Sequence, residues 1–134
     1  MLNDVETGND YRRTILIVED DDLFRKSLTT FVSSLGYTTL SARSAEEALD
    51  ECTKGSIGAC VSDFHLPAMN GIELAEALRT RGLEIPVVLL SGYLTDAVRA
   101  EAKVAGVLTL LRKPTDLGQL QQTIARLFTG KGYY

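Results

Sequence analysis

Two kinds of hydrophobic pattern alternate along the chain. Five short runs are mostly apolar and β-branched, as expected for parallel strands that are covered on both faces. Five other segments repeat an apolar residue every three or four positions, which is typical of helices that bury one side. We expect the strands at residues 14–18, 37–41, 57–62, 85–90 and 107–111. The alternation predicts an α/β domain of (βα)₅ order with an open, doubly wound, five-stranded parallel sheet.

The expected helices carry start and stop signals. The apolar stripe of the first helix ends before Gly36, a residue type suited to the position after a helix. Ser44, followed three residues later by Glu47, has the pattern of a capping box and marks the start of the second. The third helix is expected at about residues 71–81, the fourth at about 95–104, and the fifth has an apolar face from Leu117 to Phe128. The run 37–41 is more polar than the other strands, so we expect it at an edge of the sheet.

Length and charge narrow the classes of protein. A chain of 134 residues has room for one well-packed domain. We place it at residues 14–129, between a flexible N-terminal extension at 1–13 and a C-terminal tail at 130–134. The net charge of −4, without a long Lys or Arg cluster, argues against direct nucleic-acid binding. An acidic start and the absence of any apolar run near ~20 residues predict no membrane insertion and a cytoplasmic location.

The two cysteines, Cys52 and Cys60, have no neighbouring Cys or His at the spacing of metal ligands. Free cysteine commonly behaves as a small buried hydrophobic residue. We expect both thiols to be reduced, with Cys60 inside a strand.

Acidic residues collect where two of the expected strands end. Residues 19–22 are Glu19, Asp20, Asp21 and Asp22, directly after the first apolar run, and Asp63 follows the third. A solvated loop or a helix cap at Asp22 explains part of this acidity. Carboxylates that share one crevice repel each other, however, and oxygen ligands of this kind suit Mg²⁺. In a doubly wound sheet the ligand site lies at the carboxyl ends of the strands, where these acids fall.

A hydroxyl and an ammonium group follow the remaining strands of the predicted sheet. Ser91 and Gly92 end the fourth strand, and Lys113 ends the fifth. Each of these residues alone is more often a turn residue or a solvated charge. Their joint appearance with the acids favours a reaction centre. A carboxylate can attack phosphorus to form an acyl phosphate if the charge on the transferred group is offset, and Mg²⁺, Lys113 and the Ser91 hydroxyl can supply that offset.

Four motifs in this order and spacing resemble the receiver domains of response regulators in two-component signalling. They are residues 15–21 (ILIVEDD), 61–71 (VSDFHLPAMNG), 88–92 (VLLSG) and 112–114 (RKP). The resemblance covers about residues 14–129. It implies a flavodoxin-like sheet with strand order 2-1-3-4-5.

The resemblance also implies a role for each acidic residue of the site. Asp63 corresponds to the aspartate that accepts the phosphoryl group. Asp20 corresponds to a direct Mg²⁺ ligand, Glu19 to an acid that acts mainly through water, and the main-chain carbonyl of His65 to a further ligand. Asp21 and Asp22 have no role in the family and are expected in the loop and at the helix start.

Two further positions complete the resemblance. Ser91 corresponds to the switch hydroxyl that moves toward the phosphoryl group. Lys113 corresponds to the lysine of the family's site, and a cis peptide bond is expected between it and Pro114.

Three features depart from the usual family pattern. Leu110 stands where many receivers have Tyr or Phe, which puts the usual coupled rotation of hydroxyl and aromatic ring in doubt. Thr115 stands where an apolar residue often follows Lys-Pro. His65 and Tyr93 occupy the variable positions beside the phosphoryl group, and we hypothesise that they shield the acyl phosphate from water. His65 as a zinc ligand is disfavoured because no second His or suitably spaced Cys accompanies it.

The resemblance implies a signalling domain rather than an enzyme, apart from its own phosphotransfer and autodephosphorylation. Its expected partners are a sensor histidine kinase or phosphotransfer protein upstream and an effector protein or domain downstream. The expected signalling face comprises the fourth helix, fifth strand and fifth helix, and a homodimer through this face is one option. The chain can be a stand-alone receiver or part of a longer protein.

Three other functions compete with this interpretation. An Asp-nucleophile phosphatase generally has a second Asp two residues after the nucleophile, where this chain has His65. A pseudo-receiver that only binds partners would not need the full set of Glu19, Asp20, Asp63, Ser91 and Lys113. Flavin binding lacks a phosphate-binding loop after the first strand.

Overall fold

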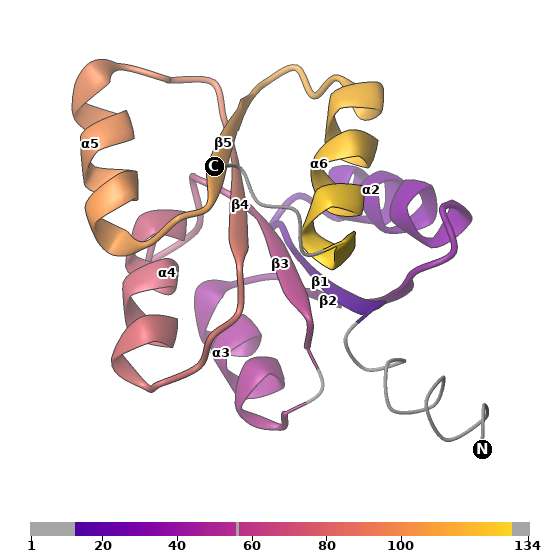
Figure 1. Cartoon of the computed structure of the whole chain (residues 1–134), viewed down its shortest axis with the longest axis horizontal. Coiled ribbons are helices and arrows are strands. Elements are labelled where there is room, and N and C mark those ends of the chain that lie inside the picture. The colour runs from indigo at the N-terminus through magenta and orange to yellow at the C-terminus, as the bar shows by residue number, and fades with distance from the viewer. Residues whose placement is uncertain (1–12, 56, 130–134) are drawn as a thin grey trace.

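The computed structural model describes residues 13–55 and 57–129, in which five strands alternate with five helices (Figure 1). The elements are β1 (Thr14–Val18), α2 (Asp22–Ser34), β2 (Thr38–Ala42), α3 (Ala45–Thr53), β3 (Ala59–Asp63), α4 (Gly71–Thr80), β4 (Val87–Ser91), α5 (Asp96–Ala105), β5 (Thr109–Arg112) and α6 (Leu117–Thr129). Apart from Arg13, the predicted extension and tail lie outside the described residues. None of the helices in the described residues has the length and apolar character needed to cross a membrane.

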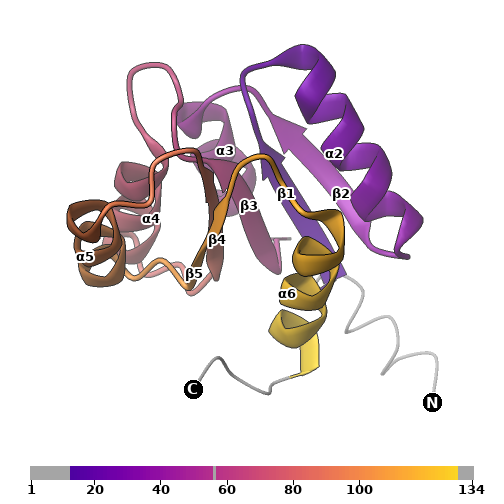
Figure 2. The same cartoon turned by 90° about the horizontal axis from the view of Figure 1, so that it is seen from above.

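The sheet has the order β2-β1-β3-β4-β5 and all its pairings are parallel. This confirms the predicted fold and strand order. Helices α2 and α6 cover one face, and α3, α4 and α5 cover the other (Figures 1 and 2). Since β2 and β3 lie on opposite sides of β1, the crossover connections diverge there, and a crevice is expected at the carboxyl ends of β1 and β3.

Two hydrophobic layers lie on either side of the sheet. Alternate residues of β1 divide between them, because neighbouring side chains of a strand point to opposite faces. Leu16 and Val18 join the layer with the α3, α4 and α5 residues, whereas Ile15 and Ile17 join the layer with α2 and α6. All four side chains are fully buried. In β2, by contrast, Leu40 is exposed, as expected for an edge strand.

Four strands begin later than the hydrophobic pattern predicts, β2 by one residue and β3, β4 and β5 by two. Ile57, Ile85 and Val107 were expected inside strands, but β3, β4 and β5 each begin two residues further on. All three side chains belong to or pack against the hydrophobic layer on the α3 side. Their apolar character therefore reflects burial in the loops that lead into the sheet, and burial alone does not distinguish such a loop from a strand.

The helix starts confirm one half of the predicted capping box. The Ser44 hydroxyl accepts a hydrogen bond from the Glu47 N–H at 3.1 Å, but the Glu47 carboxylate accepts from the N–H of Arg43 rather than from that of Ser44. A complete capping box opens α4 instead, where the Asn70 side chain and the Glu73 carboxylate each accept from the other's N–H. The α2 helix gives way to Gly36 at φ 99°, as predicted.

Both cysteines are free and buried, as expected. Cys52 lies on α3 and Cys60 lies on β3. Burial raises the pKa of the Cys52 thiol to about 11, and it raises the pKa of Cys60 further. Neither thiol is therefore ionised near neutral pH.

Candidate functional site

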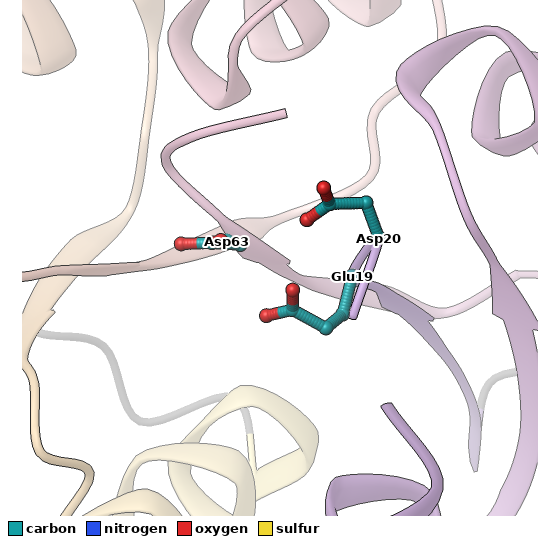
Figure 3. A group of neighbouring side chains, drawn as sticks. All are labelled: Glu19, Asp20 and Asp63. Atoms are coloured by element: carbon teal, nitrogen blue, oxygen red, sulfur yellow. The ribbon is translucent and has the colours of Figure 1, made fainter. Parts of the chain in front are cut away.

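Three carboxylates meet at the carboxyl edge of the sheet. Glu19 and Asp20 follow β1, and Asp63 ends β3, which pairs with β1 through Val18 and Ser62. One carboxylate oxygen from each acid lies within 4.8 Å of the others. Figure 3 shows the side chains of Glu19 and Asp20 leaving the end of one strand and turning toward Asp63. The grouping predicted from the strand ends is thus present in the fold.

The acids are poorly compensated by the protein alone. Glu19 and Asp63 are buried, and the group that approaches Glu19 Oε1 and Asp63 Oδ1 is the Lys113 ammonium, at 3.9 Å and 2.9 Å. Burial, followed by repulsion from Asp63, raises the pKa of Glu19 from 4.5 to about 7, although the Asp21 N–H and Lys113 oppose this change. Three converging acids beside one ammonium group are unfavourable unless a further cation joins them. A set of carboxylate oxygens of this kind suits Mg²⁺.

Lys113 brings a positive charge to the same place. Its Nζ lies 2.9 Å from Asp63 Oδ1 and 3.9 Å from Glu19 Oε1. The ammonium group also lies 5.0 Å from the centre of the Phe24 ring, within the range of a cation–π contact. The peptide bond to Pro114 is cis, as predicted. The ammonium is therefore held between the Asp63 carboxylate and the first turn of α2.

Ser91 ends β4 beside the strand that carries Asp63, because Leu90 pairs with Asp63. Its side chain is fully buried. The hydroxyl donates to the main-chain oxygen of Tyr93 at 2.9 Å and accepts from the Tyr93 N–H at 3.0 Å. In this structure the Ser91 hydroxyl thus stabilises the loop that follows β4.

His65 and Tyr93 lie next to each other on the loops after β3 and β4. Their ring centres are 5.9 Å apart in an edge-to-face arrangement, and His65 packs in the same way against Phe64. Tyr93 is 66% exposed. The contact brings together the two residues that we expect beside the phosphoryl group. Metal ligation by the His65 carbonyl stays a prediction.

Asp21 and Asp22 lie in the loop and at the helix start, as expected, but the cap suggested for Asp22 is wrong, since Asp21 caps the helix one residue earlier. Asp21 is the N-cap of α2 and accepts a hydrogen bond from the N–H of Phe24. Asp22 is the first residue of the helix and pairs with Arg25, which lowers the pKa of the Asp22 carboxyl.

Two residues near β5, Leu110 and Thr115, differ from the usual residues of the family, and their surroundings differ. Leu110 pairs with Leu89 and packs, half-buried, against the hydrophobic layer on the α3 side. The Thr115 hydroxyl oxygen is buried without a hydrogen-bond partner.

Sequence reasoning missed the local roles of three residues. Phe24 contacts the Lys113 ammonium, and Arg25 donates to the main-chain oxygen of Glu19 at 3.0 Å. At Gly71 there is no room for a side chain, because a Cβ would lie 2.6 Å from Leu89 Cδ2 and 2.9 Å from the main-chain oxygen of Asp63. The one signal in the sequence for this close approach is a glycine at the expected start of a helix, shortly after the strand that ends at Asp63.

Comparisons with known proteins agree with this geometry. Regulator of RpoS from Escherichia coli K12 is 37% identical over 113 residues, which is 84% of this chain and 34% of that protein. Sensor histidine kinase RcsC from Salmonella typhi is 32% identical over 111 residues, 83% of this chain and 12% of that protein. The chain thus spans about a third or less of these relatives.

A solved structure and a family model cover most of the chain. The chemotaxis protein CheY4 of Vibrio cholerae superposes with a TM-score of 0.81 at 26% identity, covering 86% of this chain and 98% of that protein. The model of the response regulator receiver domain matches residues 15–125. The chain therefore belongs to the family of response regulator receiver domains.

Proposed function

We propose that this receiver domain accepts a phosphoryl group on Asp63 in a Mg²⁺-dependent reaction. The observation that carries the proposal is the meeting of Glu19, Asp20, Asp63 and the Lys113 ammonium at one edge of the sheet. The three acids there share the ammonium of Lys113, which leaves negative charge that a bound cation would balance.

Glu19, Asp20 and Asp63 would hold the metal, together with the main-chain carbonyl of His65 that the family resemblance implies. Bound Mg²⁺ supplies positive charge that offsets the negative charge of the transferred phosphoryl group. A carboxylate oxygen of Asp63 attacks phosphorus, the bond from phosphorus to the donor breaks, and its electron pair leaves with the donor. Lys113, now 2.9 Å from Asp63, pairs with a phosphoryl oxygen of the product.

The upstream donor is a protein with a phosphorylated histidine, either a histidine kinase or a phosphotransfer protein. One relative of the chain is a sensor histidine kinase, which supports this class of partner. Downstream, the domain acts on an effector protein or domain.

Ser91 gives the site a route to the rest of the domain. Its hydroxyl is bonded to the main chain of Tyr93 and has to leave these partners to donate to a phosphoryl oxygen. The loop between β4 and α5 then loses two hydrogen bonds. This exchange provides a signal that does not require an aromatic ring at the position of Leu110.

The test is modification by acetyl phosphate, followed by intact-protein mass spectrometry. We expect the wild type to gain one phosphoryl group with Mg²⁺ and none with EDTA. Asp63→Asn should gain none, whereas Asp50→Asn, which alters an exposed acid on α3, should behave as the wild type. Modification that persists in Asp63→Asn would refute the assignment of the acceptor. A wild type that never responds would favour a module that only binds partners.

A further inference from the structure

We propose that Arg25 is a positioning residue for the metal site. Its guanidinium group holds the turn after β1 in the shape that makes the carboxylates of Glu19 and Asp20 converge. This inference rests on the proposed Mg²⁺-dependent function, because the convergence matters only if these acids share an ion.

The Arg25 guanidinium binds the turn at two points, and the main-chain N–H adds a helix bond that any residue other than proline would make at this position. Its Nη1 donates to the main-chain oxygen of Glu19 at 3.0 Å, and its Nη2 donates to Asp22 Oδ1 at 2.7 Å. Its own N–H donates to the main-chain oxygen of Asp21 at 2.8 Å. The Arg25 side chain is only 13% exposed, so it is held against the protein rather than extended into solvent.

The turn needs such a fixed shape. Consecutive residues of an extended chain point to opposite sides, yet Glu19 and Asp20 both bring a carboxylate oxygen within 4.8 Å of one on Asp63. The carbonyl that Arg25 binds belongs to the peptide group between Glu19 and Asp20. Fixing this carbonyl therefore fixes the relative direction of the two side chains, against the repulsion between their charges.

The two cations near the site have different contacts. Lys113 contacts the carboxylates of Asp63 and Glu19 directly. Arg25 contacts the main chain behind them and the outward-facing Asp22, which also lies 3.9 Å from Arg43 Nε. A planar guanidinium can reach both acceptors at once, whereas a lysine ammonium at this position could not reproduce the same fork.

The test measures Mg²⁺ binding by calorimetric titration of the full chain, with magnesium chloride and no phosphodonor. We expect Arg25→Gln to weaken binding roughly tenfold, equivalent to about 1.4 kcal/mol. Arg25→Lys should lie between Arg25→Gln and the wild type, because it retains a donor without the fork. Lys26→Gln removes the same charge from the next, exposed residue and should stay within about twofold of the wild type.

A merely structural role would give a different result. Urea unfolding in EDTA measures the stability of each variant without the ion, and the titrations are compared for protein that is fully folded by this criterion. Asp22→Ala removes one partner of the guanidinium but keeps the Glu19 contact, so its affinity should stay within about threefold. Arg25→Gln and Arg25→Lys that both bind Mg²⁺ as tightly as the wild type would overturn the role of Arg25. A wild type that binds no Mg²⁺ would overturn the proposed site itself.

Discussion

Replacing Gly71 by alanine forces one methyl group against the end of the strand that carries Asp63. The new Cβ would lie 2.6 Å from Leu89 Cδ2, 2.9 Å from the main-chain oxygen of Asp63 and 3.3 Å from Cα of Phe64. Real Cβ atoms do not approach other atoms to the first two distances, so something must move. Two of the three neighbours are main-chain atoms and cannot rotate away. The start of α4 and the end of β3 must therefore separate.

The magnitude follows from two opposing effects. Gly71 has no left-handed φ, so alanine gains up to about 1 kcal/mol of helix propensity there. Overpacking of a filled interior costs about 1–3 kcal/mol, and main-chain neighbours favour the upper part of this range. We expect Gly71→Ala to lower the free energy of unfolding by about 1–2 kcal/mol. Phosphorylation of Asp63 should also slow, since its carbonyl is displaced.

Urea unfolding followed by circular dichroism measures this loss. Gly92→Ala is the matched control, because its Cβ would meet no atom within 4 Å and its φ is not left-handed. We expect the control to stay within about 0.5 kcal/mol of the wild type. A Gly71→Ala protein as stable as the wild type would refute the reasoning, because helix propensity would then outweigh the contact.

Three further predictions concern the site and its helices. Because burial raises the pKa of Glu19 to about 7, its contribution to stability is present below pH 4.5 and is lost as pH rises through 7. In EDTA, wild type should therefore lose roughly 2 kcal/mol more than Glu19→Gln between pH 5 and 8 in urea unfolding, less than the roughly 3 kcal/mol of the full shift because this pH range covers only part of the titration. Tyr93→Ala should speed loss of phosphate from Asp63 a few-fold in a time course of radiolabel release, since Tyr93 covers His65 at the edge of the site; an unchanged rate would contradict shielding. Asn70→Ala removes the cap of α4 and should lower thermal stability by about 1 kcal/mol, and an unchanged melting temperature would contradict this role.

The hydrophobic pattern predicted every strand and helix, but of the strand starts only that of β1. Ile57, Ile85 and Val107 are apolar because they pack against the sheet layers, and a sequence pattern records burial rather than main-chain pairing. The pattern correctly predicted the cap at Ser44, but it also predicted the reciprocal Glu47 bond that goes to Arg43 instead, and it did not point to the complete box at Asn70. Both errors concern local hydrogen bonds, whose partners depend on loop geometry.

The grouping of Glu19, Asp20, Asp63 and Lys113 could be predicted from the sequence, because the carboxyl ends of parallel strands lie at one edge of the sheet. The same reasoning could not identify Arg25, because its contact with the Glu19 carbonyl depends on where the first turn of α2 lies over the loop. Every residue has a main-chain carbonyl, so a side chain that binds one has no partner of a characteristic residue type in the sequence. Distances in the fold were needed to find this residue.

The burial and protonation of the two native thiols have a practical consequence for labelling experiments on this domain in solution. Thiol-directed labels react with the thiolate at a surface, and Cys52 and Cys60 are at most 1% exposed with raised pKa values. A single cysteine introduced at Val104, which is 72% exposed on α5, would then carry a fluorophore or spin label at one defined position. The native sequence could stay otherwise intact while the label reports how α5 moves.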